Sequence, residues 1–371
     1  MRVDAFDFDL PASQIAQQPR PRGDSRLLVV DRAAATWRDA SIRDLPSILT
    51  PGDLLVVNDT KVFPARLLGR RDPSGGAVEC LLLEREAEPG VWQALVHPGQ
   101  KLKPGTKFIV EDPARAPGLA IQGEILDRLY FGRRRVRLSA DDRTAPRDPR
   151  TPNPQDPGTL GPGDPLDLAV DRLGHVPLPP YIHRADTAAD RERYQTIYAR
   201  ARGSIAAPTA GLHFDDALLA SLDAAGIRRA AITLHVGYGT FKPVRVDEVE
   251  AHTVDPERYA VPPATADAIA RAKAEGRRVI AVGTTTTRAL EHAAARTGRV
   301  EAGVGQTSLF IRPGHTFRAI DGLLTNFHLP RSSLLMLVAA FAGHDLTMAA
   351  YRDAVARGFR FYSYGDAMVI L

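Results

Sequence analysis

Residues 278–285, Arg-Val-Ile-Ala-Val-Gly-Thr-Thr, decide the fold class. Four consecutive apolar residues at 279–282 predict a buried strand, and Gly283 predicts a tight turn directly after it. Residues 286–296 follow with helical spacing. A strand, a tight turn and a helix in immediate succession are typical of an α/β domain.

The same alternation recurs toward both ends of the chain. Before residue 66, we expect strands at 26–31 and 54–57 and a short helix at 45–49. After residue 180, we expect a strand at 229–236 and helices at 190–202, 215–225, 264–274, 332–341 and 346–357. The strand at 54–57 runs into small polar residues at 58–60, and open α/β sheets place ligand sites at such strand ends.

Residues 66–138 have a different pattern. Short strand-like runs, separated by Gly and Pro with no helical period, occupy 65–69, 77–84, 92–97, 107–110, 120–126 and 133–138. They predict a small antiparallel β-barrel domain at 66–140, inserted into a discontinuous α/β domain formed by 1–65 and 170–371. Because 141–165 hold seven prolines and one large apolar residue, we expect a disordered or extended Pro-rich surface loop over 141–169.

Composition excludes several classes of protein. The 371 residues carry a net charge of +4, which is compatible with a polyanionic partner. The single cysteine, Cys80, excludes an intramolecular disulfide and any metal site that needs two cysteines. The most apolar stretch, 334–342, is about half as long as a membrane span, and the acidic, alternating start is unlike a signal peptide. We expect a soluble cytoplasmic protein with no metal site and no membrane association.

Common nucleotide and zinc motifs are missing. Gly237-Tyr238-Gly239 is followed by Lys242 where a dinucleotide fingerprint needs its third glycine. Neither a phosphate-binding Gly-x-x-x-x-Gly-Lys-Ser/Thr loop nor a His-Glu-x-x-His helix occurs. The chemistry therefore has to come from other segments.

Four loops with small polar residues or histidine lie at predicted strand or helix ends: 203–215, 234–241, 282–288 and 325–333. Free N–H groups at a helix start suit an anion, and a histidine suits proton transfer. Structural explanations stay open, with Asp215 as a helix N-cap, His235 as a core histidine and the threonines at 284–287 as capping residues. The terminal segment 361–370 sets aromatic rings beside Asp366, either to stack a base or to pack the core.

At these segments the chain resembles the S-adenosylmethionine:tRNA ribosyltransferase-isomerases of queuosine biosynthesis. The resemblance extends from Phe6-Asp7-Phe8-Asp9-Leu10-Pro11 to Tyr364-Gly365-Asp366-Ala367-Met368, essentially the whole chain. Its most specific strings are Asn-Asp-Thr-Lys-Val at 58–62, Ala-Ala-Pro-Thr-Ala-Gly-Leu-His-Phe at 206–214, His-Val-Gly at 235–237 and Leu-Thr-Asn-Phe-His-Leu-Pro at 324–330.

The resemblance implies an α/β domain with an inserted β-barrel and an unusual use of S-adenosylmethionine. Family members transfer its ribosyl group, not its methyl group, to 7-aminomethyl-7-deazaguanine at the wobble position of tRNA. The products are epoxyqueuosine-tRNA, adenine and methionine. S-adenosylmethionine is thus expected as a substrate, with no separate cofactor, and we expect a monomer whose macromolecular partner is tRNA.

Residue chemistry within these motifs nominates the site. The catalytic candidates are His213, His235, His328 and Asp366. The expected substrate-binding residues are Asn58, Asp59, Thr60, Pro208, Thr209, Gly211, Gly237, Gly283, Thr284, Thr285, Thr325, Asn326, Arg331, Ser332 and Tyr364. Among them, Arg331 and the threonines after Gly283 are expected to hold the methionine carboxylate, and Asp59 or Asp366 to bind a ribose hydroxyl or orient a histidine.

The tRNA-binding candidates are clustered arginines of the inserted domain. Strand alternation places Arg133, Arg135 and Arg137 on one face, and Arg70 and Arg71 lie where the domain begins. The alternative is a solvated face of an arginine-rich protein. Two other functions also stay open: an S-adenosylmethionine-dependent tRNA modifier that transfers a different group, and a noncatalytic RNA-binding protein with this fold.

Overall fold

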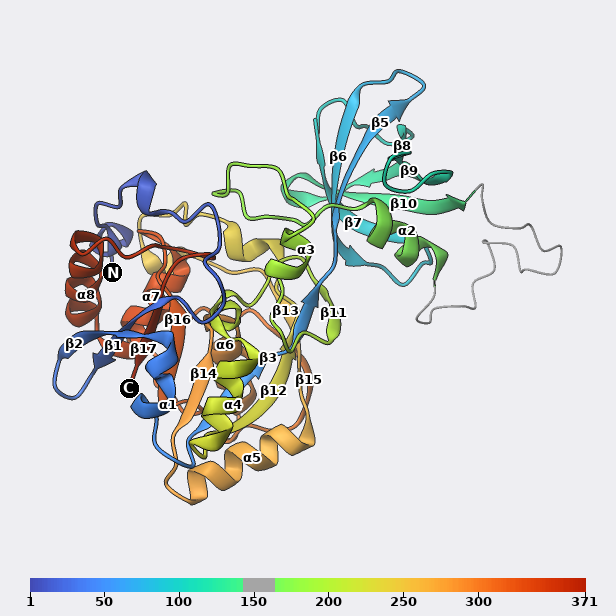
Figure 1. The fold of residues 1–371 in the computed structure, drawn as a ribbon. Coiled ribbons are helices and arrows are strands. Elements are labelled where there is room, and N and C mark those ends of the chain that lie inside the picture. The colour runs from blue at the N-terminus through green and yellow to red at the C-terminus, as the bar shows by residue number, and fades with distance from the viewer. Residues whose placement is uncertain (143–163) are drawn as a thin grey trace. The chain divides into compact units, whose positions relative to one another are not determined.

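The computed structural model describes residues 1–142 and 164–371 (Figure 1). The chain divides into two compact units. The α/β unit comprises Met1–Val62, Pro179–Ala185 and Glu192–Leu371, and the barrel unit comprises Phe63–Leu178 and Asp186–Arg191. The barrel unit is therefore an insertion in the α/β unit.

A nine-stranded mixed sheet forms the centre of the α/β unit. Its strands, in spatial order, are β15 (Gly303–Thr307), β13 (Glu257–Val261), β12 (Arg228–Leu234), β3 (Leu54–Asn58), β14 (Val279–Val282), β16 (Gly322–Asn326), β17 (Ala367–Ile370), β1 (Arg26–Asp31) and β2 (Thr36–Ser41). The four neighbours β12, β3, β14 and β16 run parallel. Their carboxyl ends therefore meet at one edge of the sheet, where open α/β sheets bind ligands.

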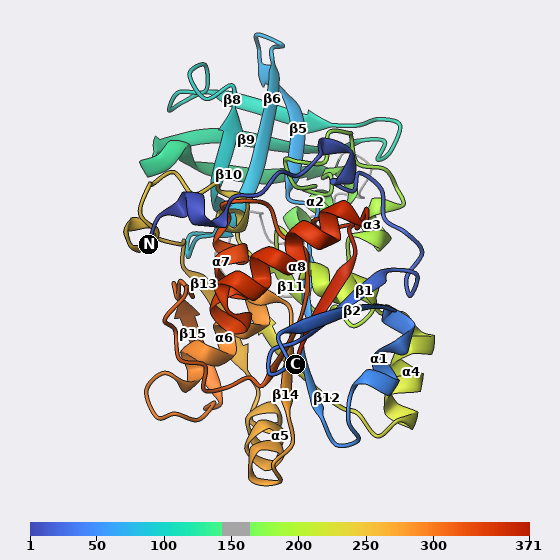
Figure 2. The same ribbon diagram turned by 90° about the vertical axis from the view of Figure 1, so that its left-hand side faces the viewer.

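Helices cover both faces of this sheet, because its strands alternate two apolar sets. In β3, Leu54 and Val56 belong to the hydrophobic cluster that also contains residues of α5 (Pro263–Ala274), α6 (Thr284–Ala294), α7 (Ser333–Ala342) and α8 (His344–Ala356). Leu55 and Val57 belong to the cluster that contains residues of α1 (Leu45–Ile48) and α4 (Asp216–Ala224), which lie together in Figure 2. A strand buried on both faces is a continuous apolar run, as 54–57 is.

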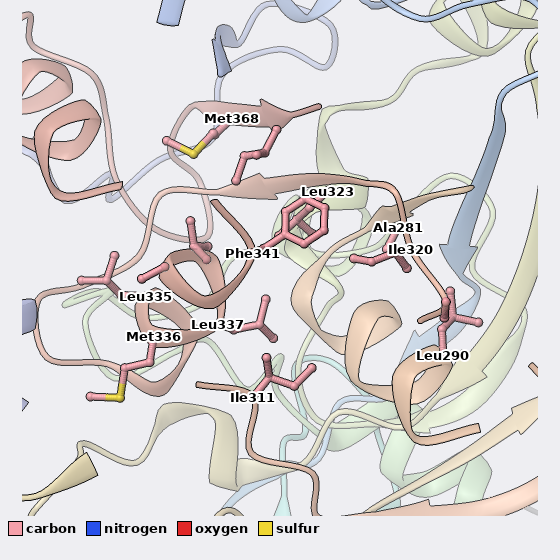
Figure 3. Close-up of a cluster of buried hydrophobic side chains, with 14 of the residues drawn as sticks. Ala281, Leu290, Ile311, Ile320, Leu323, Leu335, Met336, Leu337, Phe341 and Met368 are labelled. Carbon is pink, nitrogen blue, oxygen red and sulfur yellow. The ribbon is translucent and has the colours of Figure 1, made fainter. Parts of the chain in front are cut away.

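Figure 3 shows part of the larger cluster. Leu335, Met336, Leu337 and Phe341 of α7 are labelled there together with Ala281 of β14, Leu323 of β16 and Leu290 of α6, which belong to the same cluster. Each fully buried aliphatic or aromatic side chain stabilises the fold by about 1.5–3 kcal/mol. This packing fixes α6 and α7, whose first turns lie at the carboxyl edge of β14 and just after β16.

Six antiparallel strands close into the barrel, in the order β10-β7-β6-β5-β8-β9. They are β5 (Arg66–Asp72), β6 (Ala77–Arg85), β7 (Val91–His97), β8 (Lys107–Glu111), β9 (Leu119–Arg128) and β10 (Arg133–Asp142). The Phe108 ring covers Gly123 on the paired strand, and a Cβ there would lie 2.2 Å from the ring. Cys80 is buried inside, and burial raises the pKa of its thiol to about 12.

The remaining elements are shorter. They are α2 (Pro165–Leu173), α3 (Asp190–Arg193), the short parallel pair β4 (Thr60–Val62) and β11 (Ala201–Ser204), and 3₁₀ turns at Val3–Phe6, Ala12–Gln14, Ile42–Asp44, Tyr130–Gly132, Thr209–His213, Tyr238–Phe241 and Val249–Ala251. In the described part of the chain, no single helix is long and apolar enough to cross a membrane, and α7 and α8 reach that length only as a pair bent by 117°.

The predicted fold class and all six barrel strands are confirmed. The helix predicted at 190–202 is wrong, because only Asp190–Arg193 is helical and Ala201–Ser204 pairs with β4. Between them, the Gln195 amide forms two hydrogen bonds with the backbone of Val62, and helical spacing alone did not reveal this.

The boundaries of the Pro-rich segment also differ from those expected. Its central residues, 143–163, lie outside the described residues. Asp141 and Asp142 end strand β10, and the last part forms α2, which is capped by the Asp164 side chain and starts at Pro165. Proline at a first helical position favours the helix, so the proline count was misleading there.

Candidate active site

A cavity lies at the carboxyl ends of β12, β14 and β16 and encloses about 520 Å³, including solvent at its mouth. Residues 206–210, 283–285, 325–328 and 362–363 form most of its wall, together with Tyr181, Val236, Thr240 and Leu334. Eight of the predicted site residues line it: Pro208, Thr209, Gly283, Thr284, Thr285, Thr325, Asn326 and His328. Loops far apart in the sequence thus form one site.

The turn after β14 supplies one wall through Gly283, Thr284 and Thr285. Gly283 has φ 94° and ψ 154°, a conformation almost restricted to glycine, so the turn requires this residue. The hydroxyls of Thr286 and Thr287 donate to the carbonyls of Val282 and Gly283, just before the helix. Thr285 lines the cavity, and its buried hydroxyl has no hydrogen-bond partner among the described residues. That hydroxyl is available to a ligand.

The loop after β16 supplies a second wall and the one candidate histidine that lines the cavity. His328 Nε2 lies 2.9 Å from the hydroxyl oxygen of Thr325, and its backbone N–H donates to the Tyr351 hydroxyl. Burial lowers the pKa of His328 to about 3. The imidazole is therefore neutral near pH 7 and acts there as a hydrogen-bonding group.

Asn326 connects this loop to Tyr362. Its Nδ2 donates to the Tyr362 carbonyl at 3.0 Å, and the Tyr362 N–H donates to the carbonyl of Phe327 at 3.0 Å. Tyr362 has φ 74°, which is uncommon for a residue with a Cβ. Its ring packs edge-on against Tyr181, with centroids 3.8 Å apart. A strained residue held from two sides keeps a fixed aromatic wall on the cavity.

His213 is buried directly behind Asn326. The hydroxyl of Ser25 lies 2.7 Å from Nδ1. Burial lowers the pKa of His213 to about 4, although the adjacent Asn326 side chain raises it. His213 Nε2 and Asn326 Oδ1 are both buried without a hydrogen-bond partner among the described residues. His213 does not line the cavity, whereas the adjacent Asn326 does.

His235 belongs to a separate polar cluster. Its Nδ1 lies 2.8 Å from the hydroxyl of Thr60, which also lies 2.9 Å from the hydroxyl of Ser204. Burial lowers the pKa of His235, and the negative charge of Asp59 partly offsets that effect. His235 is half-buried and does not line the cavity described above.

Asn58 and Asp59 hold the ends of neighbouring strands together. The Asn58 amide exchanges two hydrogen bonds with the backbone of Leu234. Asp59 accepts from Arg200 and from the Thr233 hydroxyl. The side-chain polar atoms of Asn58 and Asp59, which we predicted to bind the substrate, therefore form hydrogen bonds within the protein instead.

The other predicted residues of the α/β unit are also not part of the cavity wall: Gly211, Gly237, Arg331, Ser332, Tyr364 and Asp366. Asp366 is fully buried and accepts from the Arg20 guanidinium and from the backbone N–H groups of Arg26 and Arg360. It therefore anchors the 360–366 turn that carries Tyr362. Arg331 is exposed and forms an ion pair with Asp7.

In the barrel unit, the predicted alternation of β10 is correct, since Arg134 is buried and Arg137 is exposed. The outward arginines have acidic neighbours. Arg135 contacts Glu86, Glu88 and Asp127, and Arg137 contacts Glu88 at 2.8 Å. Arg70 pairs with Glu111, and the guanidinium of Arg71 lies against Gly76. Much of the positive charge of this surface is therefore balanced by carboxylates.

The cavity also contains residues that sequence reasoning missed. Tyr181 and Ser363 contact each other through their hydroxyls, and Thr240 is a further lining residue. Tyr362 and Ser363 lie in the aromatic segment 361–370, but nothing in the sequence connects Tyr181 with that segment. Only the tertiary structure brings these residues together.

Comparisons with known proteins identify the family of this chain. A family model described as queuosine biosynthesis protein matches residues 3–370. The S-adenosylmethionine:tRNA ribosyltransferase-isomerases of Anaeromyxobacter sp. (strain Fw109-5) and Desulfitobacterium hafniense are 51% and 46% identical, over 100% of this chain and 99% and 100% of theirs. The crystal structure of S-adenosylmethionine tRNA ribosyltransferase from Thermotoga maritima is similar with a TM-score of 0.53 and 37% identity, covering 99% of this chain and all of that one. The chain belongs to the queuosine biosynthesis protein family.

Proposed function

We propose that this protein transfers and isomerises the ribosyl group of S-adenosylmethionine onto 7-aminomethyl-7-deazaguanine at the tRNA wobble position. The products are epoxyqueuosine-tRNA, adenine and methionine. One observation carries the proposal. The loops at 206–210, 283–285 and 325–328 line one cavity, in a chain that matches relatives named for this activity over its full length.

The chemistry requires proton removal beside a positive sulfur. The sulfonium acidifies the C5′–H of the ribose, so a base removes that proton and adenine leaves. The aminomethyl nitrogen of the tRNA base then attacks the unsaturated sulfonium sugar, and closure of the epoxide expels methionine. Two features of the cavity wall support substrate binding there: the neutral imidazole of His328, which can form a hydrogen bond, and the Thr285 hydroxyl, which has no protein partner among the described residues.

The candidate residues fall into two groups. His328 touches the cavity, so we assign it a direct contact with the substrate. His213 and Asp366 act through Asn326 and the Tyr362 turn, as positioning residues. His235 is the remaining candidate for proton transfer, held by Thr60.

Partners and location follow from the same proposal. S-adenosylmethionine is the donor substrate, and no separate cofactor is needed. The tRNA is the acceptor, with Arg70, Arg71, Arg133, Arg135 and Arg137 as its proposed contacts in the barrel unit. The protein acts as a cytoplasmic monomer.

The deciding experiment measures both leaving groups. The protein is incubated with S-adenosylmethionine and tRNA that carries the aminomethyl-deazaguanine base, and adenine and methionine are quantified. Equal amounts of the two are expected, with none when the tRNA lacks the modified base. Formation of S-adenosylhomocysteine would instead identify a methyltransferase, and the absence of any product would identify a binding protein.

A further inference from the structure

A buried ion pair joins Arg288 of helix α6, one turn beyond the threonines of the cavity, to Glu257 of strand β13. Arg288 Nη1 donates to Glu257 Oε2 at 2.5 Å, and Arg288 Nε donates to the Leu309 carbonyl at 2.9 Å. Both side chains are more than nine-tenths buried, with 9% of Arg288 and 4% of Glu257 exposed. An ion pair so far from water is costly unless its hydrogen-bonding groups are satisfied.

One end of this arginine is not satisfied. Arg288 Nη2 is buried and has no hydrogen-bond acceptor among the described residues. Glu257 cannot serve it, because Oε1 accepts from the Gly237 N–H and the Thr240 hydroxyl while Oε2 is used on Nη1. A guanidinium nitrogen left without an acceptor in the interior marks a place where an anionic ligand would be stabilised.

Nη2 belongs to a residue that lines a second cavity of the α/β unit, which encloses about 400 Å³ including adjoining solvent. This cavity shares Thr240 and Leu334 with the cavity described above. The two cavities are therefore adjacent, and Arg288 lines the neighbour of the cavity described above. Asp255 also lines the second cavity and pairs with Lys242 at 2.7 Å.

We infer that Arg288 binds the carboxylate of the methionyl group of S-adenosylmethionine, an inference that rests on the proposed function. The methionyl group is a zwitterion, so it adds no net charge beside the neutral Arg288–Glu257 pair. Its carboxylate supplies the acceptor that Nη2 lacks. Arg331, which the sequence suggested for this task, is 58% exposed and already paired with Asp7.

The test compares S-adenosylmethionine with its decarboxylated analogue, which keeps the adenosine and the sulfonium. Binding of each to the protein without tRNA is measured by calorimetry. The wild type should prefer the carboxylated ligand by about 10- to 100-fold, since hydrogen bonds to charged groups contribute about 1.5–3 kcal/mol. In R288K the single ammonium stays with Glu257, so the two ligands should bind with about equal affinity. The affinity for the decarboxylated analogue should change less than threefold.

A matched variant and a substitute variant complete the design. R331K should keep the wild-type preference. If R288K does not fold, as judged by its thermal unfolding, R288Q/E257Q removes both charges and should give the same loss of preference. The inference is overturned if the preference survives in the folded variant, if both ligands weaken equally, or if R331K loses the preference instead.

Adenine release from modified tRNA is measured in parallel. If the wild type releases adenine but R288K still prefers the carboxylated ligand, the role of Arg288 is contradicted and the proposed function is not. Wild-type protein that binds S-adenosylmethionine but releases no adenine contradicts the proposed function.

Discussion

The hydroxyl oxygen of Thr60 lies 2.8 Å from Nδ1 of His235, although 175 positions separate the two residues. They meet because β3 and β12 are parallel neighbours and both polar segments follow these strands. A hydroxyl at Nδ1 fixes the orientation of the imidazole and leaves Nε2 for proton transfer. This contact makes the role of His235 testable without changing the histidine.

Replacing Thr60 by valine should therefore lower turnover about tenfold, which corresponds to ~1.4 kcal/mol of activation free energy. S-adenosylmethionine affinity should change less than twofold, because Thr60 is not part of the cavity wall. Single-turnover adenine release and calorimetry measure the two quantities. Thr297→Val, on the surface, is the matched control. Full turnover in Thr60→Val would remove His235 from the mechanism.

The buried imidazole of His213 makes stability depend on pH. Its pKa is about 4 in the folded protein and about 6.5 when unfolded. Below pH 6.5 the unfolded chain binds the extra proton, so the free energy of unfolding falls as the pH drops toward 4. The loss from this group amounts to roughly 3 kcal/mol.

His213→Gln should remove that part of the decline between pH 7 and pH 4. Urea unfolding of both proteins at several pH values measures it. His183→Gln, at an exposed position, should leave the decline unchanged. A decline as steep in His213→Gln as in the wild type would mean that His213 is not buried as a neutral imidazole.

Two glycine-to-alanine variants can show whether Gly283 is needed for activity as well as for the turn. Gly283→Ala forces an L-residue into a conformation almost restricted to glycine, at a cost of about 1–3 kcal/mol. It should also lower turnover about tenfold, because Thr284 and Thr285 would move. Gly276→Ala, at φ 65° with nothing within 4 Å of the new Cβ, should cost about 1 kcal/mol and leave turnover unchanged. Equal turnover in the two variants would contradict a role for this turn in the site.

The contribution of the β10 arginines to tRNA binding can be tested with one variant that removes positive charge and another that removes negative charge. Replacing Arg133, Arg135 and Arg137 together by Gln should weaken tRNA binding and reduce the salt slope by about 1 for each phosphate that is no longer neutralised. Glu88→Gln should strengthen binding, because it removes the carboxylate shared by Arg135 and Arg137. Filter binding across a salt series measures both. Unchanged affinity in both variants would assign these arginines to a solvated face.

Sequence patterns predicted those parts of the molecule in which local and tertiary preferences agree. The six barrel strands alternate apolar residues between turns, and the β14–α6 unit combines an apolar run with an obligatory glycine. Thr285 and His328 could be predicted as cavity residues because they follow buried strands directly. The sheet topology then brings these strand ends together.

Contacts between residues far apart in the sequence could not be predicted from local sequence patterns. Arg288 is the last residue of the segment 282–288 that the sequence analysis selected, but Glu257 lies on an antiparallel strand far from it in the sequence, so their pairing was not predicted. Asp366 has the residue type expected of a catalytic carboxylate, and only its three donors show that it anchors a turn. Residue type indicates what a side chain is able to do, whereas its neighbours decide what it does.

The position of β17 has a consequence for synthesis. This strand lies between β16 and β1, although residues 367–370 are translated after every other strand of the sheet. The β1–β2 hairpin, made early, has no neighbour in the sheet until those residues have left the ribosome. The barrel unit is complete by Arg191 and can fold while the ribosome is still translating. The β1–β2 hairpin is therefore joined to the rest of the larger sheet last, after translation has passed residue 370.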